Sequence, residues 1–190
     1  MLTETLKEST QEIHQEAEKK MIAQLKGVKT TEDYVHLLNW LYGFYHPVEE
    51  LAAPWLSGDL FPDMDKRMRA DNLLQDMAAT GLPLPPREMA DQLPRIDSTA
   101  KALGALYVLE GSTLGGRVIA TMLGRQLGPE QRYTFFNAYG LETDSMWETF
   151  KTYLGRPYTP DEAGEIIAAA NETFTIFKNW IDLHELQPQL

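Results

Sequence analysis

Four glycines stand in a stretch, residues 98–127, that contains no proline and has apolar residues at helical spacing. They are Gly104, Gly111, Gly115 and Gly116. A glycine inside a helix costs about 1 kcal/mol against alanine, which is a large loss for a domain with a total stability of about 5–15 kcal/mol. At about 100° per residue, the first three glycines share one stripe. The stripe predicts either close helix–helix packing or bare backbone facing a flat ligand, and the Gly115-Gly116 pair predicts a bend.

Length and composition exclude several classes of protein. The 190 residues fit a single domain over residues 1–190. A net charge of −11 argues against a broad nucleic-acid surface, and the lack of cysteine excludes disulfides, thiolate nucleophiles and cysteine-ligated metals. No apolar run is long enough to cross a bilayer and no signal peptide is visible. We therefore expect a cytoplasmic protein that binds neither nucleic acid nor membrane.

Apolar residues recur at spacings of three and four along most of the chain, which predicts an all-α fold. A capping box at Thr5 marks the start of the first helix, and Thr159-Pro160 marks the start of the last. A kink or break is expected before Pro47. The expected helices cover about 5–25, 31–46 and onward, 66–79, 98–127, 130–137, 145–154 and 159–184, with a connector at 82–86.

One face of the first helix carries Lys7, Thr10, His14 and Glu18 at spacings of three and four. Glu18 can accept a hydrogen bond from the His14 ring and so fix which nitrogen is free to bind a metal. Lys7 lies about 10 Å away along the helix, a separation that suits a ligand with a central metal and a carboxylate at its rim. Taken alone, this face is better explained as a solvated helix surface with an incidental His14–Glu18 pair. Combined with the glycine stripe, it predicts a slot for a planar, metal-bearing, dianionic ligand, and haem fits that description.

Three stretches resemble the haem oxygenase family. Residues 6–18 resemble the proximal helix of these enzymes, and residues 107–116 resemble the distal helix of the bacterial, biliverdin-producing branch that includes phytochrome-associated enzymes. Residues 40–50 are similar to the family's second helix, and the last helix aligns through Thr159-Pro160 and Phe174. The resemblance implies a single-domain helical bundle with haem between the first helix and a glycine-rich, kinked distal helix.

The resemblance also implies roles for individual residues. His14 is expected to be the axial ligand of the haem iron, with Glu18 orienting it. Ser112 stands where mammalian members have a distal aspartate, and Lys151 is the nearest substitute for two basic residues that would fall at about Met146 and Phe150. The implied distal side comprises Tyr45, Gly111, Ser112, Gly115 and Gly116, and the remaining haem contacts are Lys7, Tyr107, Lys151 and Phe174.

The implied reaction uses haem as both cofactor and substrate, with iron, O2 and a reductant, and yields biliverdin, carbon monoxide and ferrous iron. The electron donor would be a ferredoxin, a flavodoxin or a reductase, for which Arg117 and Arg125 are candidate docking residues, and the protein would be a monomer or a weak dimer.

The main alternative is a haem-binding or haem-delivery protein without turnover. A thiamine-salvage hydrolase would need a cysteine nucleophile. A di-iron carboxylate oxidase would need repeated Glu-x-x-His pairs, and only residues 33–36 come near that pattern.

Overall fold

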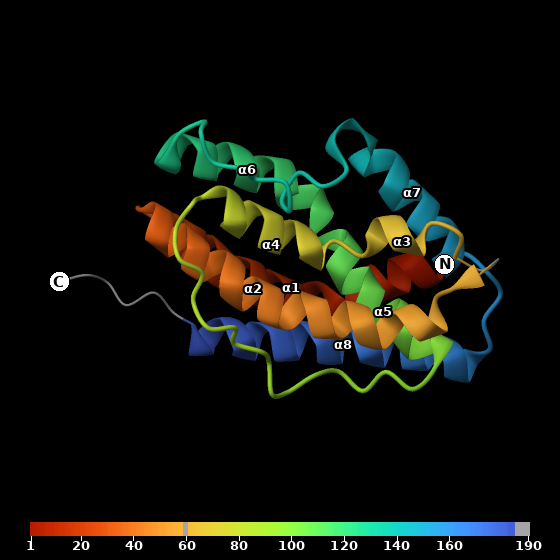
Figure 1. The fold of residues 1–190 in the computed structure, drawn as a ribbon. Coiled ribbons are helices and arrows are strands. Elements are labelled where there is room, and N and C mark those ends of the chain that lie inside the picture. Colours follow the sequence, from red (N-terminus) through yellow and green to blue (C-terminus); the bar gives the residue numbers. More distant parts are fainter. Residues whose placement is uncertain (59–60, 185–190) are drawn as a thin grey trace.

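The protein is built from helices joined by loops, in a computed structural model that describes residues 1–58 and 61–184 (Figure 1). This part of the chain contains no strand, which confirms the all-α prediction. The longer helices are α1 (Leu2–Gly27), α2 (Thr31–Ala52), α4 (Ala70–Ala79), α5 (Thr99–Gly111), α6 (Thr113–Leu127), α7 (Thr143–Leu154) and α8 (Pro160–Leu183). Shorter turns of helix are η1 (Ala53–Trp55), α3 (Met64–Arg67) and η3 (Gly140–Glu142).

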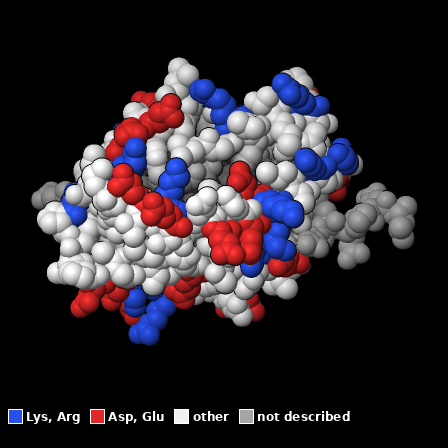
Figure 2. All heavy atoms as spheres, turned by 180° about the vertical axis from the view of Figure 1, so that it is seen from behind, with Lys and Arg blue, Asp and Glu red and all other residues white. Residues whose placement is uncertain are grey.

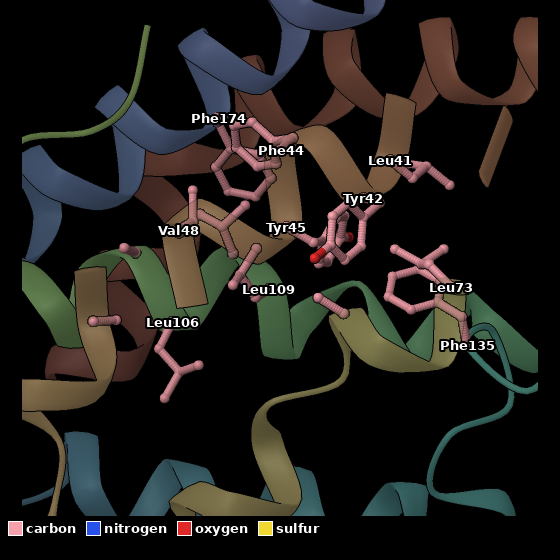
Figure 3. Packing of buried hydrophobic residues seen from close by; sticks show 14 of the residues in the cluster. Leu41, Tyr42, Phe44, Tyr45, Val48, Leu73, Leu106, Leu109, Phe135 and Phe174 are labelled. Carbon is pink, nitrogen blue, oxygen red and sulfur yellow. The ribbon is translucent and has the colours of Figure 1, made fainter. Parts of the chain in front are cut away.

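The core lies where α8 packs against α1 and α5, and where α2 packs against α4 and α5. Its buried apolar residues form one cluster. Figure 3 shows Val48 of α2 beside Leu109 of α5, with Phe44 of α2 on the side of Phe174 of α8. Each fully buried large apolar side chain contributes about 1.5–3 kcal/mol, so this cluster holds the central helices together. The helices α6 and α7 lie along the upper edge of Figure 1, and they add Leu123, Phe150 and Leu154 to this cluster.

Gly104 serves close packing between α5 and α8. A Cβ atom at this position would lie 2.3 Å from the Ile166 carbonyl oxygen and 2.8 Å from the Ala169 Cβ. Of the two interpretations of the glycine stripe, helix–helix packing is therefore the right one at Gly104. The stripe does not continue as one bare face.

The helix α2 is continuous across Pro47, so the predicted break is wrong. Proline has no N–H to donate to the carbonyl four residues earlier, which belongs to Gly43. The backbone N–H of Ala90 donates to that carbonyl instead, at 3.0 Å. Gly43 also has no side chain to hinder this approach, since a Cβ there would lie 1.9 Å from the Glu88 carbonyl oxygen. The long connection between α4 and α5 is thereby attached to α2.

Two other predicted helices are interrupted or absent. In both, side-chain carboxylates accept hydrogen bonds from backbone N–H groups that a continuous helix would use. The stretch expected as one helix over 66–79 is divided into α3 and α4, since the buried Glu49 carboxylate accepts the backbone N–H groups of Arg69 (2.9 Å) and Ala70 (3.0 Å). Residues 130–137 form turns instead of a helix, and the Phe135 N–H donates to Asp76 at 2.9 Å. The first helix begins at Leu2, earlier than Thr5.

The glycine-bearing stretch is divided at Ser112 into α5 and α6, and α6 runs without a break through Gly115 and Gly116, the position predicted for a bend. The Ser112 hydroxyl donates to the Leu109 carbonyl at 2.6 Å, and the Thr113 hydroxyl donates to the Glu110 carbonyl at 2.7 Å. Such side-chain donors compete with the backbone N–H groups that would continue the helix. Gly116 instead lets the loop at Phe136 approach, because a Cβ there would lie 1.9 Å from the Phe136 carbonyl oxygen.

The contact at Gly104 predicts a stability effect. We expect Gly104→Ala to lower the free energy of unfolding by about 1–3 kcal/mol, as overpacked cores do. The matched control is Gly164→Ala in α8, where a Cβ would meet nothing within 4 Å and where better helix propensity adds up to about 1 kcal/mol. Urea unfolding measures both. Equal changes for the two variants would contradict the packing argument.

Candidate functional site

The helix α1 and the pair α5–α6 are joined at two places. At one place, the Tyr107 hydroxyl lies beside the Thr10 hydroxyl. At the other, the Gln126 side-chain amide donates to the carbonyls of Leu25 (3.2 Å) and Val28 (2.7 Å), at the end of α1. Both segments run in the same direction between these two joints.

Between the two joints α1 packs mainly on α8 and makes few backbone contacts with α5 or α6. The facing segment includes the break at Ser112, so α5 and α6 do not form one straight helix there. We call the space between α1 and α5–α6, from one joint to the other, the slot.

The α5–α6 wall of this slot has open space in front of its backbone. A Cβ added at Gly111 or Gly115 would meet nothing within 4 Å, unlike one at Gly104 or Gly116. On the same stretch Leu114 and Val118 are apolar yet 46% and 72% exposed. Exposed apolar side chains beside open backbone indicate a site for an apolar ligand. Figure 2 shows a hollow in the surface, with Lys and Arg side chains around it.

His14 stands on the opposite wall, one helical turn after the joint at Thr10. Its imidazole is exposed and stacks on the buried Phe174 ring of α8, with the ring centres 5.1 Å apart. The structure therefore brings His14 and Phe174 together. Glu18 is exposed and makes no hydrogen bond to His14 in the described part of the chain, so stacking alone orients the imidazole here.

The predicted carboxylate-binding residues lie near the Thr10–Tyr107 joint. Lys7 is exposed, one turn before Thr10 on α1. Burial raises the pKa of Tyr107, whose ring lies 5.8 Å from that of Trp147 in α7. Lys151 follows Trp147 by one turn and forms an ion pair with Glu148 at 2.7 Å. Two cations and a phenol hydroxyl therefore surround this end of the slot.

The other end of the slot, near Gln126, is a cleft of about 720 Å³. It includes Arg117 and Arg125, the two predicted docking residues. Lys26 and Lys29, from the end of α1, bring the number of cations to four in a chain with a net charge of −11. The complete lining is Lys26, Lys29, Arg117, Val118, Thr121, Met122, Arg125 and Gln126.

Tyr45 and Ser112 meet at the break between α5 and α6, as predicted for a polar network. The Tyr45 hydroxyl donates to the Ser112 hydroxyl oxygen at 3.0 Å, and Ser112 in turn donates to the Leu109 carbonyl. Burial raises the pKa of Tyr45, so its hydroxyl keeps its proton at neutral pH. Ser112 itself is exposed.

Sequence reasoning missed a buried ionic cluster behind this break. Glu110 and the two arginines Arg67 and Arg69 are each at most 3% exposed. Arg67 pairs with the Glu110 carboxylate, Tyr139 donates its hydroxyl to the same carboxylate at 2.8 Å, and Arg69 donates to the Leu109 carbonyl at 2.8 Å. The sequence did contain a signal, because Glu110 directly follows the apolar run 102–109. A carboxylate in a buried helix needs a partner.

Residues 1–58 and 61–184 hold no group of three or more His, Cys, Asp or Glu residues that could bind a metal ion. The ligand set that a di-iron oxidase requires is therefore not assembled there. None of the helices in this part of the chain has the length and apolar character needed to cross a membrane.

Comparisons with known proteins agree with this geometry. A family model described as heme oxygenase matches residues 1–182. The chain is 31% identical to a heme oxygenase of Xanthomonas campestris over 154 residues, which are 80% of this chain and 90% of the relative. It is also 31% identical over 106 residues to the heme oxygenase PigA of Pseudomonas aeruginosa, covering 56% of this chain and 52% of the relative.

Two solved structures share the fold. One is the heme oxygenase of Neisseria meningitidis, with NO and CO bound, which aligns at a TM-score of 0.80 and 21% identity over 100% of this chain and 95% of that chain. The other is the heme oxygenase of Leptospira interrogans, at a TM-score of 0.79 and 22% identity over 96% of this chain and 98% of that chain.

Proposed function

The chain belongs to the haem oxygenase family, and from this premise we propose that haem binds in the slot between α1 and α5–α6, within a single domain. His14 would be the iron ligand, and Gly111 and Gly115 would form the opposite wall. The observation that carries this proposal is the open space in front of those two glycines. The function is that of a haem oxygenase: with O2 and electrons, haem is opened at a meso carbon to give biliverdin, carbon monoxide and ferrous iron.

The residues present fit haem. A planar, largely apolar ring suits a slot with bare backbone and the exposed Leu114 and Val118 on one wall. An exposed imidazole on the other wall suits the iron, and Phe174 supports it from behind. Lys7, Tyr107 and Lys151 lie at the end where the two carboxylates of haem would be held.

Bound haem would supply both the iron that activates O2 and the ring that is oxidised. The protein would contribute position and protons. The open backbone at Gly111 and Gly115 would let α5–α6 lie close to a bound ring and keep bulky groups away from it. Tyr45 and Ser112 would hold protons at the edge of the slot. Because no protein nucleophile is needed, the absence of cysteine is no obstacle.

The electron donor belongs to the same proposal. Four cations around the cleft near Gln126 suit an acidic carrier, such as a ferredoxin or a flavodoxin, and the cytoplasm would provide such a carrier. Arg117 and Arg125 would meet it at the edge of the slot, which keeps the path to the haem short.

Replacement of the proposed iron ligand tests the proposal directly. We expect His14→Ala to abolish the ferric haem spectrum of a histidine-ligated complex, because the described residues place no other imidazole on the slot side of α1. His36→Ala is the control, since His36 lies on α2 near His184. Absorption and electron paramagnetic resonance spectra of the two reconstituted variants give the answer. An unchanged His14→Ala spectrum would remove His14 as the ligand.

Filling the slot should stop turnover without unfolding the protein. In Gly115→Leu the new side chain starts in open space, so the melting temperature should stay within a few degrees while biliverdin formation falls at least about tenfold, the equivalent of 1.4 kcal/mol. Gly164→Leu also starts in open space, but on α8, and should leave the rate unchanged. Normal biliverdin yield from Gly115→Leu would refute the proposed position of the ring.

Charge reversal at the cleft should affect only protein-driven reduction. With a [2Fe–2S] ferredoxin and its reductase at low salt, we expect Arg125→Glu to slow biliverdin formation about tenfold, because rim charges govern association. With ascorbate, which needs no docking, the rate should not change. Arg95→Glu makes the same charge change outside the cleft and serves as the control. Equal ferredoxin-driven rates for the two variants would move the docking site elsewhere.

A further inference from the structure

We propose that Arg69 is a positioning residue for this reaction: by holding the Leu109 carbonyl, it frees the Ser112 hydroxyl to donate a hydrogen bond into the slot. The inference rests on the proposed function, since the slot must hold haem for the donation to matter. It concerns the point where this chain departs from the mammalian pattern, a serine in place of a distal aspartate.

The three groups involved form a chain of donors that ends at one carbonyl. Tyr45 donates to the Ser112 oxygen at 3.0 Å, and Ser112 donates to the Leu109 carbonyl at 2.6 Å. Arg69 donates to the same carbonyl at 2.8 Å through Nη2. The Leu109 carbonyl therefore has two side-chain donors.

The number of protons decides what Ser112 can do. A serine hydroxyl carries one proton and can rotate to choose its acceptor. Rotation toward the slot withdraws that proton from the Leu109 carbonyl, and a buried carbonyl left without a partner is destabilising. Because Arg69 remains bonded to Leu109, the carbonyl stays satisfied during the rotation. Tyr45 meanwhile keeps its own bond to the Ser112 oxygen, which holds that oxygen in place.

The surroundings allow this rotation toward the slot. Ser112 is exposed and directly follows Gly111, in front of which a Cβ would meet nothing within 4 Å. Arg69, by contrast, cannot follow the hydroxyl. It is 3% exposed, its Nε lies 3.9 Å from the Glu110 carboxylate, and its guanidinium lies 5.5 Å from the ring centre of Phe135. A fixed donor on one side and open space on the other favour Ser112 as the donor that moves.

Carbon monoxide is a suitable probe, because the C–O stretching frequency of the ferrous haem complex falls when a donor points at the bound gas. We expect Ser112→Ala and Arg69→Met to raise this frequency by the same amount, since each removes the donation. The double variant should be no higher than either single variant. Arg69→Lys keeps a donor of similar reach and should restore much of the shift.

Turnover gives the second readout, again as a double-mutant cycle. With ascorbate as reductant, we expect Arg69→Met to slow biliverdin formation about tenfold but less than twofold in a Ser112→Ala background. The tenfold effect is smaller than the roughly 10²–10⁴-fold contribution of a direct proton donor, because Arg69 acts only through Ser112. Arg67→Met is the matched control. Arg67 is equally buried and binds Glu110, yet it donates to neither Leu109 nor Ser112, so its effect should be the same in both backgrounds.

Each failure points to a different fault. Equal effects of Arg69→Met with and without Ser112, or coupling of Arg67→Met to Ser112→Ala, would overturn the role of Arg69. Haem titration of every variant checks that binding is unchanged, so that a failure of the proposed function, seen as haem bound without His14, is recognised separately. If Arg69→Met does not fold, Arg69→Gln replaces it in the same cycle. Glutamine is uncharged and shorter than arginine but polar, so it suits a buried polar site better than methionine.

Discussion

The structure depends on two segments, α1 and α5–α6, that meet at two separate places. Tyr107 lies beside Thr10, and Gln126 donates to the carbonyls at the end of α1, whereas between these joints α1 packs mainly on α8. The slot is the space left between the two joints. It explains why apolar residues such as Val118 remain uncovered on an otherwise well-packed protein.

Features set by local sequence were predictable. The periodicity gave the helical class, and the spacing of Lys7, Thr10 and His14 gave a face that does lie along the slot. The glycines were harder, because Gly104 and Gly111 share one stripe. Which of them meets another helix depends on where α8 passes, and α8 is distant in the chain. Only the structure could separate the packing glycines, Gly104 and Gly116, from the two that face open space.

The break at Ser112 was not predictable for the same reason. The sequence showed flexible glycines at 115 and 116, whereas the actual break is produced by hydroxyl and guanidinium donors that take the carbonyls at the end of α5. One of these donors comes from Arg69, forty residues earlier than Leu109. The charge of Glu110 at the end of an apolar run predicts that this carboxylate has a buried partner. Nothing in the neighbouring sequence identifies Arg67 as that partner.

The attachment of the α4–α5 connection has a wider meaning for sequences of this kind. Pro47 leaves the carbonyl of Gly43 without a donor from its own helix, and Ala90 fills that vacancy through its backbone alone. A proline within a helix can thus create a binding point for a remote segment, namely the carbonyl four residues earlier. Any residue except proline carries the N–H that this carbonyl requires. Such an anchor therefore holds the path of the loop whatever side chain stands at position 90, with proline as the exception.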